Sequence, residues 1–334
     1  MIFVTGGTGL VGSHVLLKLT QQSREVKALK RESSCMSICR KIFSYYNADY
    51  LFEKIHWVDG SINDISSLAD AMKGCRFVLH CAAIVSFSKS DIELLKKTNI
   101  EGTANVMNIA LSSGIEKVGY VSSIATLGRN STAGEINEES YLQPSIIDSN
   151  YAVSKYFAEQ EVWRASAEGL DVVIVNPSII LGPGDWKKGS SQIFETINKG
   201  LRFYTTGSTG YVDVDDVAEA LINLLFSKIK NERFIVSAEN LSYRDCFDRI
   251  AIALGKDRAT IKVTPFLKEI AWRMEAVKSF FTGRRPLVTK ETANSAIIKK
   301  SFSSAKIQRT IGFQFTEINT TIKKYSDWFI RDLV

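Results

Sequence analysis

The chain contains 334 residues, of which 45% are hydrophobic and 23% charged, a composition typical of a soluble globular protein with a core large enough for two lobes. Its net charge of +6 is spread along the chain, which favours an anionic small-molecule ligand and does not indicate a nucleic-acid partner. Five cysteines without a CxxC pair and three scattered histidines indicate neither a metal site nor a disulfide framework, so we expect a cytoplasmic location. We also expect no transmembrane segment and no signal peptide.

The first twelve residues predict a strand, a glycine-rich turn and the start of a helix. Residues 2–5 are mostly apolar, and Gly6, Gly9 and Gly12 follow at intervals of three. A tight turn and a close approach of a diphosphate both require residues without a Cβ, and the third glycine lets the helix lie close to its strand. The free N–H groups at the helix start would face the anion. The pattern therefore predicts a dinucleotide-binding site.

Short apolar runs alternate with helix-like segments over the first half of the chain, which predicts a parallel sheet covered by helices on both faces. We expect an α/β fold of the Rossmann type, with a doubly wound sheet and ligands at the carboxyl ends of its strands. The predicted strands are 2–5, 26–29, 55–58, 77–81, 118–122 and 172–176, and the predicted helices are 11–20, 92–112 and 152–167.

The regular alternation stops near Asn176. Residues 1–177 are therefore expected to form the dinucleotide-binding domain, and residues 178–334 a smaller, mostly helical lobe that binds the substrate. Within that lobe, residues 206–237 are expected to pack back onto the first domain. They contain a predicted helix, 212–226, and a predicted strand, 234–236.

Tyr151 and Lys155 lie four residues apart at the start of a predicted helix, so they share one of its faces. A neighbouring cation stabilises a phenolate, and we expect Lys155 to lower the pKa of Tyr151 towards the range that acid–base catalysis requires. The alternative is an ordinary surface pair. Ser123 follows the predicted strand 118–122, where its hydroxyl would point into the ligand crevice and donate to a carbonyl oxygen. The alternative there is a turn residue.

The glycine turn, the serine and the Tyr-xxx-Lys pair, in this order, resemble the extended short-chain dehydrogenase/reductase superfamily, the NAD(P)-dependent epimerase/dehydratase group. Nearly the whole chain takes part, because residues 78–83 (VLHCAA), 98–103 (TNIEGT), 176–178 (NPS) and 211–218 (YVDVDDVA) also look like family motifs. The resemblance implies that Ser123, Tyr151 and Lys155 are catalytic and that Lys155 also binds the nicotinamide ribose. We expect His80 to be a core residue.

Charge at the end of the second strand predicts the cofactor. NAD-preferring relatives carry an acid there, whereas this chain has Lys30 and Arg31, with the hydroxyls of Ser33 and Ser34 nearby. We therefore expect NADP rather than NAD. Ser61 stands where the family usually has an aspartate that meets adenine, which leaves that contact open. The predicted cofactor contacts are Gly6, Thr8, Gly9, Leu10, Val11, Gly12, Lys30, Arg31, Ser61, Ile62, Cys81, Ala82, Ala83, Asn99, Tyr151, Lys155, Asn176, Pro177 and Ser178.

Three branches of the superfamily compete. Sugar-nucleotide dehydratases carry an acidic pair after the serine, but Ile124 and Ala125 follow it here. Sugar-nucleotide epimerases place an arginine clamp where this chain has Thr209, although Arg284 and Arg285 could compensate. The epimerase therefore remains an alternative, as does a non-catalytic module that senses the dinucleotide, although such relatives commonly lack the Tyr/Lys pair.

The third branch, which is similar to dihydroflavonol reductases and 3β-hydroxysteroid dehydrogenases, matches best, through the basic second-strand end, residues 176–177 and residues 282–286 (TGRRP). It implies carbonyl/alcohol interconversion on a bulky, largely apolar small molecule. The segment 266–281 reads as an amphipathic helix packed in the core or as a lid, with membrane-surface contact as the alternative. Family dimers often pair the helices corresponding to 92–112 and 151–167, so a homodimer is possible. Expected core or pocket residues are Trp186, Phe194, Phe266, Ile270, Trp272, Met274 and Val277.

Overall fold

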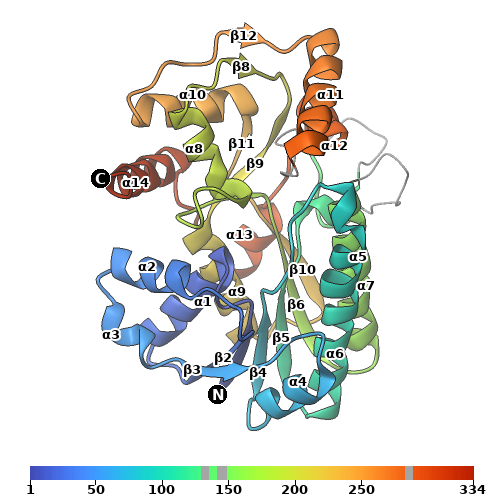
Figure 1. Ribbon diagram of the computed structural model, residues 1–334. Helices are drawn as coiled ribbons and strands as arrows, with labels where there is room; N and C mark the ends of the chain where they lie inside the picture. Colours follow the sequence, from blue (N-terminus) through green and yellow to red (C-terminus); the bar gives the residue numbers. More distant parts are fainter. Residues whose placement is uncertain (129–134, 141–148, 283–288) are drawn as a thin grey trace.

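The computed structural model describes residues 1–128, 135–140, 149–282 and 289–334 (Figure 1). Its centre is a seven-stranded sheet in the order β10-β6-β5-β4-β1-β2-β3, in which every neighbouring pair is parallel. This is the predicted doubly wound sheet. The strands are β1 (Ile2–Thr5), β2 (Val26–Lys30), β3 (His56–Asp59), β4 (Phe77–His80), β5 (Lys117–Val121), β6 (Asp171–Pro177) and β10 (Glu232–Val236).

Helices cover both faces of this sheet, because successive side chains of each strand point to opposite faces and both sets are apolar. In β1, Ile2 and Val4 belong to one core layer and Phe3 to the other. The first layer is covered by α1 (Leu10–Gln21), α2 (Ser37–Tyr45), α3 (Asp49–Phe52) and α9 (Val214–Phe226). The second is covered by α4 (Ile65–Met72), α6 (Gly102–Ser112) and α7 (Asn150–Ala167).

The long helix predicted over 92–112 has an irregular middle. It consists of α5 (Ile92–Leu95), a π-helical segment at Lys96–Glu101 and then α6. Such π-helical turns often occur at functional sites. The segment carries Asn99, whose side chain is buried.

The C-terminal part contains strands that the sequence analysis missed. Where loops and helices were expected, one small sheet joins β11 (Glu239–Ser242), β9 (Ser208–Asp213) and β7 (Ile179–Leu181), and another joins β12 (Ile261–Lys262) to β8 (Phe203–Tyr204). These strands are two to six residues long, which is too short for an apolar periodicity to mark them. The helices around them are α8 (Gln192–Asn198), α10 (Tyr243–Ala253), α11 (Pro265–Thr282), α12 (Lys290–Ser295), α13 (Ala305–Ile311) and α14 (Ile318–Arg331).

The helix predicted over 212–226 begins two residues later. Asp213 ends β9 and caps α9, because its carboxylate accepts a hydrogen bond from the Asp215 N–H at 2.8 Å. The apolar face of α9 then packs against α1 and against the strands β5 and β6. This segment of the C-terminal half therefore shares the core of the first domain (Figure 1).

The apolar residues of α11 were expected to lie in the core or a pocket, and the structure differs for three of them. The helix forms as predicted, but the Phe266 and Met274 side chains are 73% and 66% exposed and Ile270 is 37% exposed, so they are not core residues. Val277 and residues 283–286 lie outside the part whose side chains are described. Phe194 and Trp186, in contrast, do pack in the core of the C-terminal lobe. None of the described helices is long and apolar enough to cross a membrane.

Candidate active site

The glycine-rich turn leaves an accessible cradle at the start of α1. Gly6 has φ +71°, and a Cβ there would lie 2.6 Å from the Ala82 nitrogen; a Cβ on Gly12 would lie 2.2 Å from the Gly6 oxygen. Gly9 is exposed and occupies the N-cap position without any side-chain cap. The first N–H groups of α1 are therefore not capped by the N-cap residue, and Thr8, Leu10 and Val11 around them are half-buried. A dinucleotide diphosphate fits this arrangement.

The basic end of β2 is less free than its sequence implies. Lys30 and Asp59 are direct partners across the β2–β3 register, and the Lys30 ammonium forms an ion pair with the Asp59 carboxylate. Arg31 is exposed, and its backbone N–H donates to Ser34 Oγ at 3.1 Å. Nearby, Ser61 Oγ accepts from the Asn63 N–H. Of the two basic residues that were expected to bind a 2′-phosphate, Lys30 is thus paired with a carboxylate of the same chain and Arg31 is exposed.

A buried polar chain supports the carboxyl ends of β1 and β4. His80 lies between Thr5 and Thr103, with 2.6 Å from Nδ1 to Thr5 Oγ1 and 3.0 Å from Nε2 to Thr103 Oγ1. Burial lowers the pKa of His80 to about 3, so it is a neutral core residue. Asn99 is 1% exposed and binds both the N–H and the carbonyl of Ile84.

The amide of Asn99 also reaches α7, donating to Ser154 Oγ at 3.0 Å. It therefore ties the segment after β4 to the helix that carries Tyr151. In that segment Cys81 and Ala82 are half-buried and Ala83 is exposed. The predicted contacts Ile62, Pro177 and Ser178 are buried.

Ser123 and Tyr151 come together as predicted. Ser123 follows β5 and caps a single 3₁₀ turn, Ile124–Thr126, by accepting from the Ala125 N–H at 3.1 Å. Its hydroxyl lies close enough to the phenol of Tyr151 to oppose the rise in the pKa of that phenol. Tyr151 lies in the first turn of α7, which Ser149 caps. The hydroxyl and the phenol therefore share one location at the carboxyl ends of the strands.

The pKa of Tyr151 differs from the expectation. Burial raises it above the ordinary value, and the Ser123 hydroxyl only partly opposes this effect. Lys155 is 1% exposed and donates to Tyr120 Oη at 2.6 Å and to the Val121 carbonyl at 2.9 Å. The predicted lowering of the phenol pKa by Lys155 was therefore wrong, because the ammonium is directed at Tyr120. Burial also lowers the pKa of Lys155 to about 7.

Two residues that the sequence analysis missed, Tyr120 and Glu159, lie beside the predicted set. Tyr120 is a fully buried residue of β5, three positions before Ser123. Glu159 is buried on α7, four residues after Lys155, so the same helical spacing that singled out Lys155 could have found it. Asn176 is fully buried, and its amide lies 2.9 Å from Glu159 Oε2.

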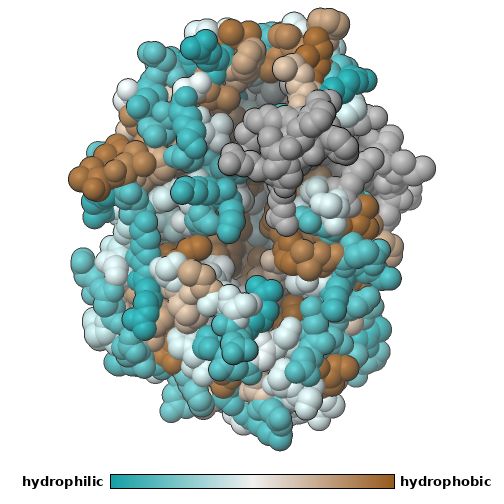
Figure 2. Space-filling model, viewed as in Figure 1, coloured by the Kyte–Doolittle hydropathy of each residue, from teal (hydrophilic) through white to brown (hydrophobic). Residues whose placement is uncertain are grey.

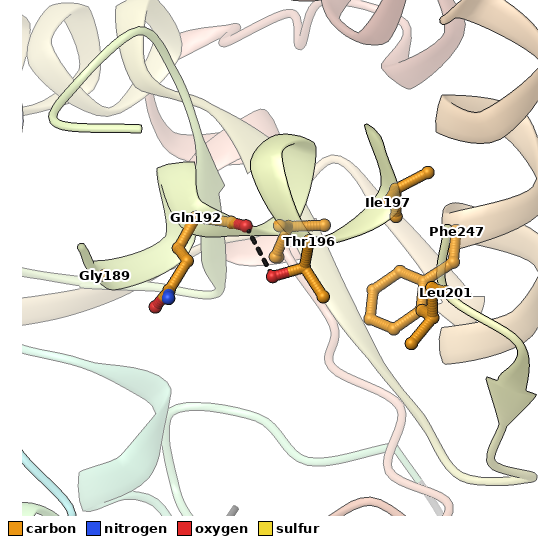
Figure 3. A pocket seen from close by; sticks show the side chains of 7 residues that line it. Gly189, Gln192, Thr196, Ile197, Leu201 and Phe247 are labelled. Atoms are coloured by element: carbon orange, nitrogen blue, oxygen red, sulfur yellow. Dashed lines mark hydrogen bonds between the residues drawn. The ribbon is translucent and has the colours of Figure 1, made fainter. Parts of the chain in front are cut away.

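A separate pocket of about 190 Å³ lies in the C-terminal lobe between α8 and α10 (Figure 3). It contains none of the predicted site residues. Figure 2 shows a further hollow in this face of the molecule between the two lobes. The pocket residues are Gly189, Gln192, Ile193, Thr196, Ile197, Leu201 and Phe247.

The comparisons with known proteins agree with this geometry. Residues 2–236 match the NAD dependent epimerase/dehydratase family. A putative dihydroflavonol 4-reductase of Synechocystis sp. is 31% identical over 336 residues, covering 98% of this chain and 94% of the relative. Sterol demethylase protein B of Methylococcus capsulatus is 25% identical over 330 residues, covering 98% and 97%. UDP-glucose 4-epimerase of Vibrio cholerae is 27% identical over 267 residues, covering 76% of each chain.

Solved structures give the same result. The crystal structure of gox2253 superposes with a TM-score of 0.82 at 30% identity, covering 99% of this chain and 98% of that one. UDP-glucose 4-epimerase from Thermotoga maritima superposes with a TM-score of 0.77 at 20% identity, covering 100% and 99%, which shows a common fold. The chain therefore belongs to the NAD-dependent epimerase/dehydratase family and is an NAD(P)-dependent oxidoreductase of the extended short-chain dehydrogenase/reductase type.

Proposed function

We propose that this enzyme uses NADP(H) to interconvert a carbonyl and an alcohol on a bulky, largely apolar small molecule. The observation that carries the proposal is the paired hydroxyls of Ser123 and Tyr151 at the carboxyl end of β5, with the buried cation of Lys155 on the same helix. The bound nicotinamide supplies or accepts the hydride. The predicted cofactor contacts, from the glycine cradle to residues 176–178, remain part of the proposal.

In the reducing direction, Ser123 donates a hydrogen bond to the substrate carbonyl oxygen and stabilises the charge that develops there. Tyr151 then delivers its phenolic proton to that oxygen. Burial keeps the Tyr151 phenol protonated at neutral pH, so the proton is in place, although the raised pKa by itself makes the phenol a weaker acid. Lys155 supplies the positive charge near this site and the contact to the nicotinamide ribose that the family resemblance implies.

The names of the relatives support an apolar carbonyl substrate. They include a putative dihydroflavonol 4-reductase, an anthocyanidin reductase of Arabidopsis thaliana and a decarboxylating sterol-4-alpha-carboxylate 3-dehydrogenase of Dictyostelium discoideum. Flavonoids and sterols share a rigid, bulky, largely apolar ring system with one oxidised or reducible carbon. That common chemistry is the substrate class we propose.

A nucleotide-sugar epimerase is the second candidate, because UDP-glucose 4-epimerase of Vibrio cholerae is among the relatives. The geometry favours it less. Thr209, at the clamp position, is 5% exposed and lies within β9, paired with Leu241 of β11. Arg284 and Arg285, which could replace the clamp, lie outside the described residues. A sensing module is a third candidate, which the retained Ser123, Tyr151 and Lys155 oppose.

Cofactor turnover distinguishes these functions. Purified protein is incubated with NADPH and one candidate substrate at a time. The candidates are dihydroquercetin, progesterone, a long-chain ketone and UDP-glucose. A reductase consumes one NADPH for each alcohol formed, which the loss of reduced-nicotinamide absorbance measures. Tightly retained NAD and conversion of UDP-glucose to UDP-galactose without an absorbance change would establish the epimerase instead. Dinucleotide binding without turnover of any of the four compounds would favour the sensing module.

A further inference from the structure

A buried carboxylate lies behind the proposed catalytic serine. Glu159 stands on α7 one turn after Lys155, and its side chain is 1% exposed. Burying an ionised carboxylate costs several kcal/mol unless other groups compensate its charge. The charge of Glu159 raises the pKa of Lys155, but this effect does not explain why its oxygens face the residues around Ser123.

One oxygen of Glu159 lies within hydrogen-bond distance of three side-chain donors, two of which flank Ser123 in the chain. Ser122 Oγ donates to Glu159 Oε2. Thr126 Oγ1 and Asn176 Nδ2 each lie 2.9 Å from the same oxygen. Thr126 Oγ1 also lies 2.9 Å from the Ser123 carbonyl oxygen, and Asn176 Nδ2 lies 3.2 Å from it. The turn of residues 122–126 is thus connected to Glu159 on both sides of Ser123.

The other oxygen of Glu159 is fixed from the edge of the sheet. Arg233 Nη1 on β10 donates to Glu159 Oε1 at 2.9 Å. Arg233 is the register partner of Ile174, whose side chain packs in the core layer beneath α7, so its guanidinium faces the same helix. Arg233 Nε in turn donates to the Glu138 carbonyl at 2.8 Å. Arg233 therefore fixes the position of the carboxylate through Oε1, while Oε2 contacts the turn that carries Ser123.

We infer that Glu159 is a positioning residue, which holds the turn of residues 122–126 so that the Ser123 hydroxyl faces Tyr151. The donors around Glu159 Oε2 come from the serine turn and the end of β6, so the contacts that satisfy the buried carboxylate also fix the backbone on both sides of Ser123. Fully satisfied buried networks of this kind fix one geometry. The inference rests on the proposed function, because that function gives Ser123 its role at the carbonyl.

A double-mutant cycle tests it. Glu159→Gln, Ser123→Ala and the double variant are assayed with NADPH and dihydroquercetin or progesterone, and NADPH affinity is measured by fluorescence. We expect Glu159→Gln to lower kcat by roughly 10- to 100-fold and to leave NADPH affinity within about twofold. In the Ser123→Ala background the same change should lower kcat by less than about twofold, because the group being positioned is already absent. An equal loss in both backgrounds would contradict a role acting through Ser123.

A second pair of variants changes less of the buried network, so that an effect on catalysis can be separated from a loss of folding. Thr126→Val removes one hydroxyl that contacts the buried carboxylate at the site, and Thr321→Val removes a comparable one, 2.7 Å from Asp213 in the C-terminal lobe. Both change one buried, β-branched residue of nearly equal size. We expect a similar fall in Tm for both variants but a fall in kcat only for Thr126→Val. Equal kcat values for the two variants would overturn the inference.

Crystal structures of the variants test the inference without an activity assay. In Glu159→Gln we expect residues 122–126 to shift and the Ser123 hydroxyl to move away from the Tyr151 phenol, while Lys155 keeps its contact with Tyr120. An unmoved turn would disprove the positioning role even if activity falls. Full activity of Ser123→Ala, in contrast, would contradict the proposed function. The crystal structure of Glu159→Gln would then still show whether Glu159 positions the turn.

Discussion

Lys155 donates from Nζ to Tyr120 Oη at 2.6 Å, and the ammonium lies 4.3 Å from the centre of the Tyr120 ring. The two residues are 35 positions apart, on α7 and β5. Because the ammonium is buried, its pKa falls from 10.5 to about 7. Because the ammonium donates to the Tyr120 hydroxyl, we expect this contact to favour the charged form of the lysine.

This contact predicts the pH dependence of the free enzyme. The lysine is charged below its pKa and loses its charge as the pH rises, so kcat/KM for reduction should fall above about pH 7. Tyr120→Phe removes an acceptor from the ammonium and should move that fall to lower pH by roughly one unit. Glu159 on α7 raises the pKa of Lys155, and it stays in place in this variant.

The control for this experiment is Tyr204→Phe, which removes a phenolic hydroxyl from β8 in the C-terminal lobe. Its pH profile should match that of the wild type. Identical profiles for the Tyr120→Phe variant and the wild type would show that the Tyr120 hydroxyl does not influence the charge of Lys155.

Tyr151→Phe should abolish turnover while leaving cofactor affinity nearly intact, because only the proton-transferring oxygen is lost. General acid catalysis contributes about 10²- to 10⁴-fold to the rate, which sets the expected fall in kcat. Lys155→Ala should damage both turnover and NADPH binding. Tyr156→Phe, five residues along the same helix, is the matched control and should retain activity. Residual activity above about a tenth in Tyr151→Phe would mean that another group donates the proton.

Cofactor choice should depend on Arg31 more than on Lys30, because Asp59 neutralises Lys30. Arg31→Ala should weaken NADPH binding by about 1.5–3 kcal/mol, the value of a hydrogen bond to a charged group, and Lys30→Ala by less. Replacing both should leave NADH binding almost unchanged. Asp59→Asn should strengthen NADPH binding severalfold by releasing Lys30. Calorimetry showing that the wild type prefers NADH, or that Asp59→Asn weakens NADPH binding, would contradict this assignment.

Two large, exposed apolar side chains indicate a dimer interface. Leu94 on α5 and Phe157 on α7 are 43% and 44% exposed, and these two helices pack against each other (Figure 1). Isolated apolar residues on a surface are ordinary, but these belong to the helices expected to pair in a dimer. We predict a homodimer by light scattering and a monomer for Leu94→Asp/Phe157→Asp. Ile252→Asp on α10, 56% exposed, should leave the dimer intact. A monomeric wild type would reject the pairing.

The local pattern of the sequence was enough to predict the central sheet, the glycine turn and the proximity of Ser123 to Tyr151. Apolar periodicity and glycine spacing are properties of neighbouring residues, and the parallel topology follows from strands that alternate with helices. The carboxyl ends of such strands meet at one edge, so a serine after β5 and a tyrosine at the start of α7 were expected to be close.

Only the tertiary structure decided which partner each charge takes. Lys155 was expected to face Tyr151 because both lie on one helix, but burial directs its ammonium to Tyr120 on a neighbouring strand. Lys30 is neutralised by Asp59 through the register of two strands. Sequence spacing says which residues share an element, whereas the partners of a charge depend on burial and on side chains brought in from other elements, which exist only once the chain has folded.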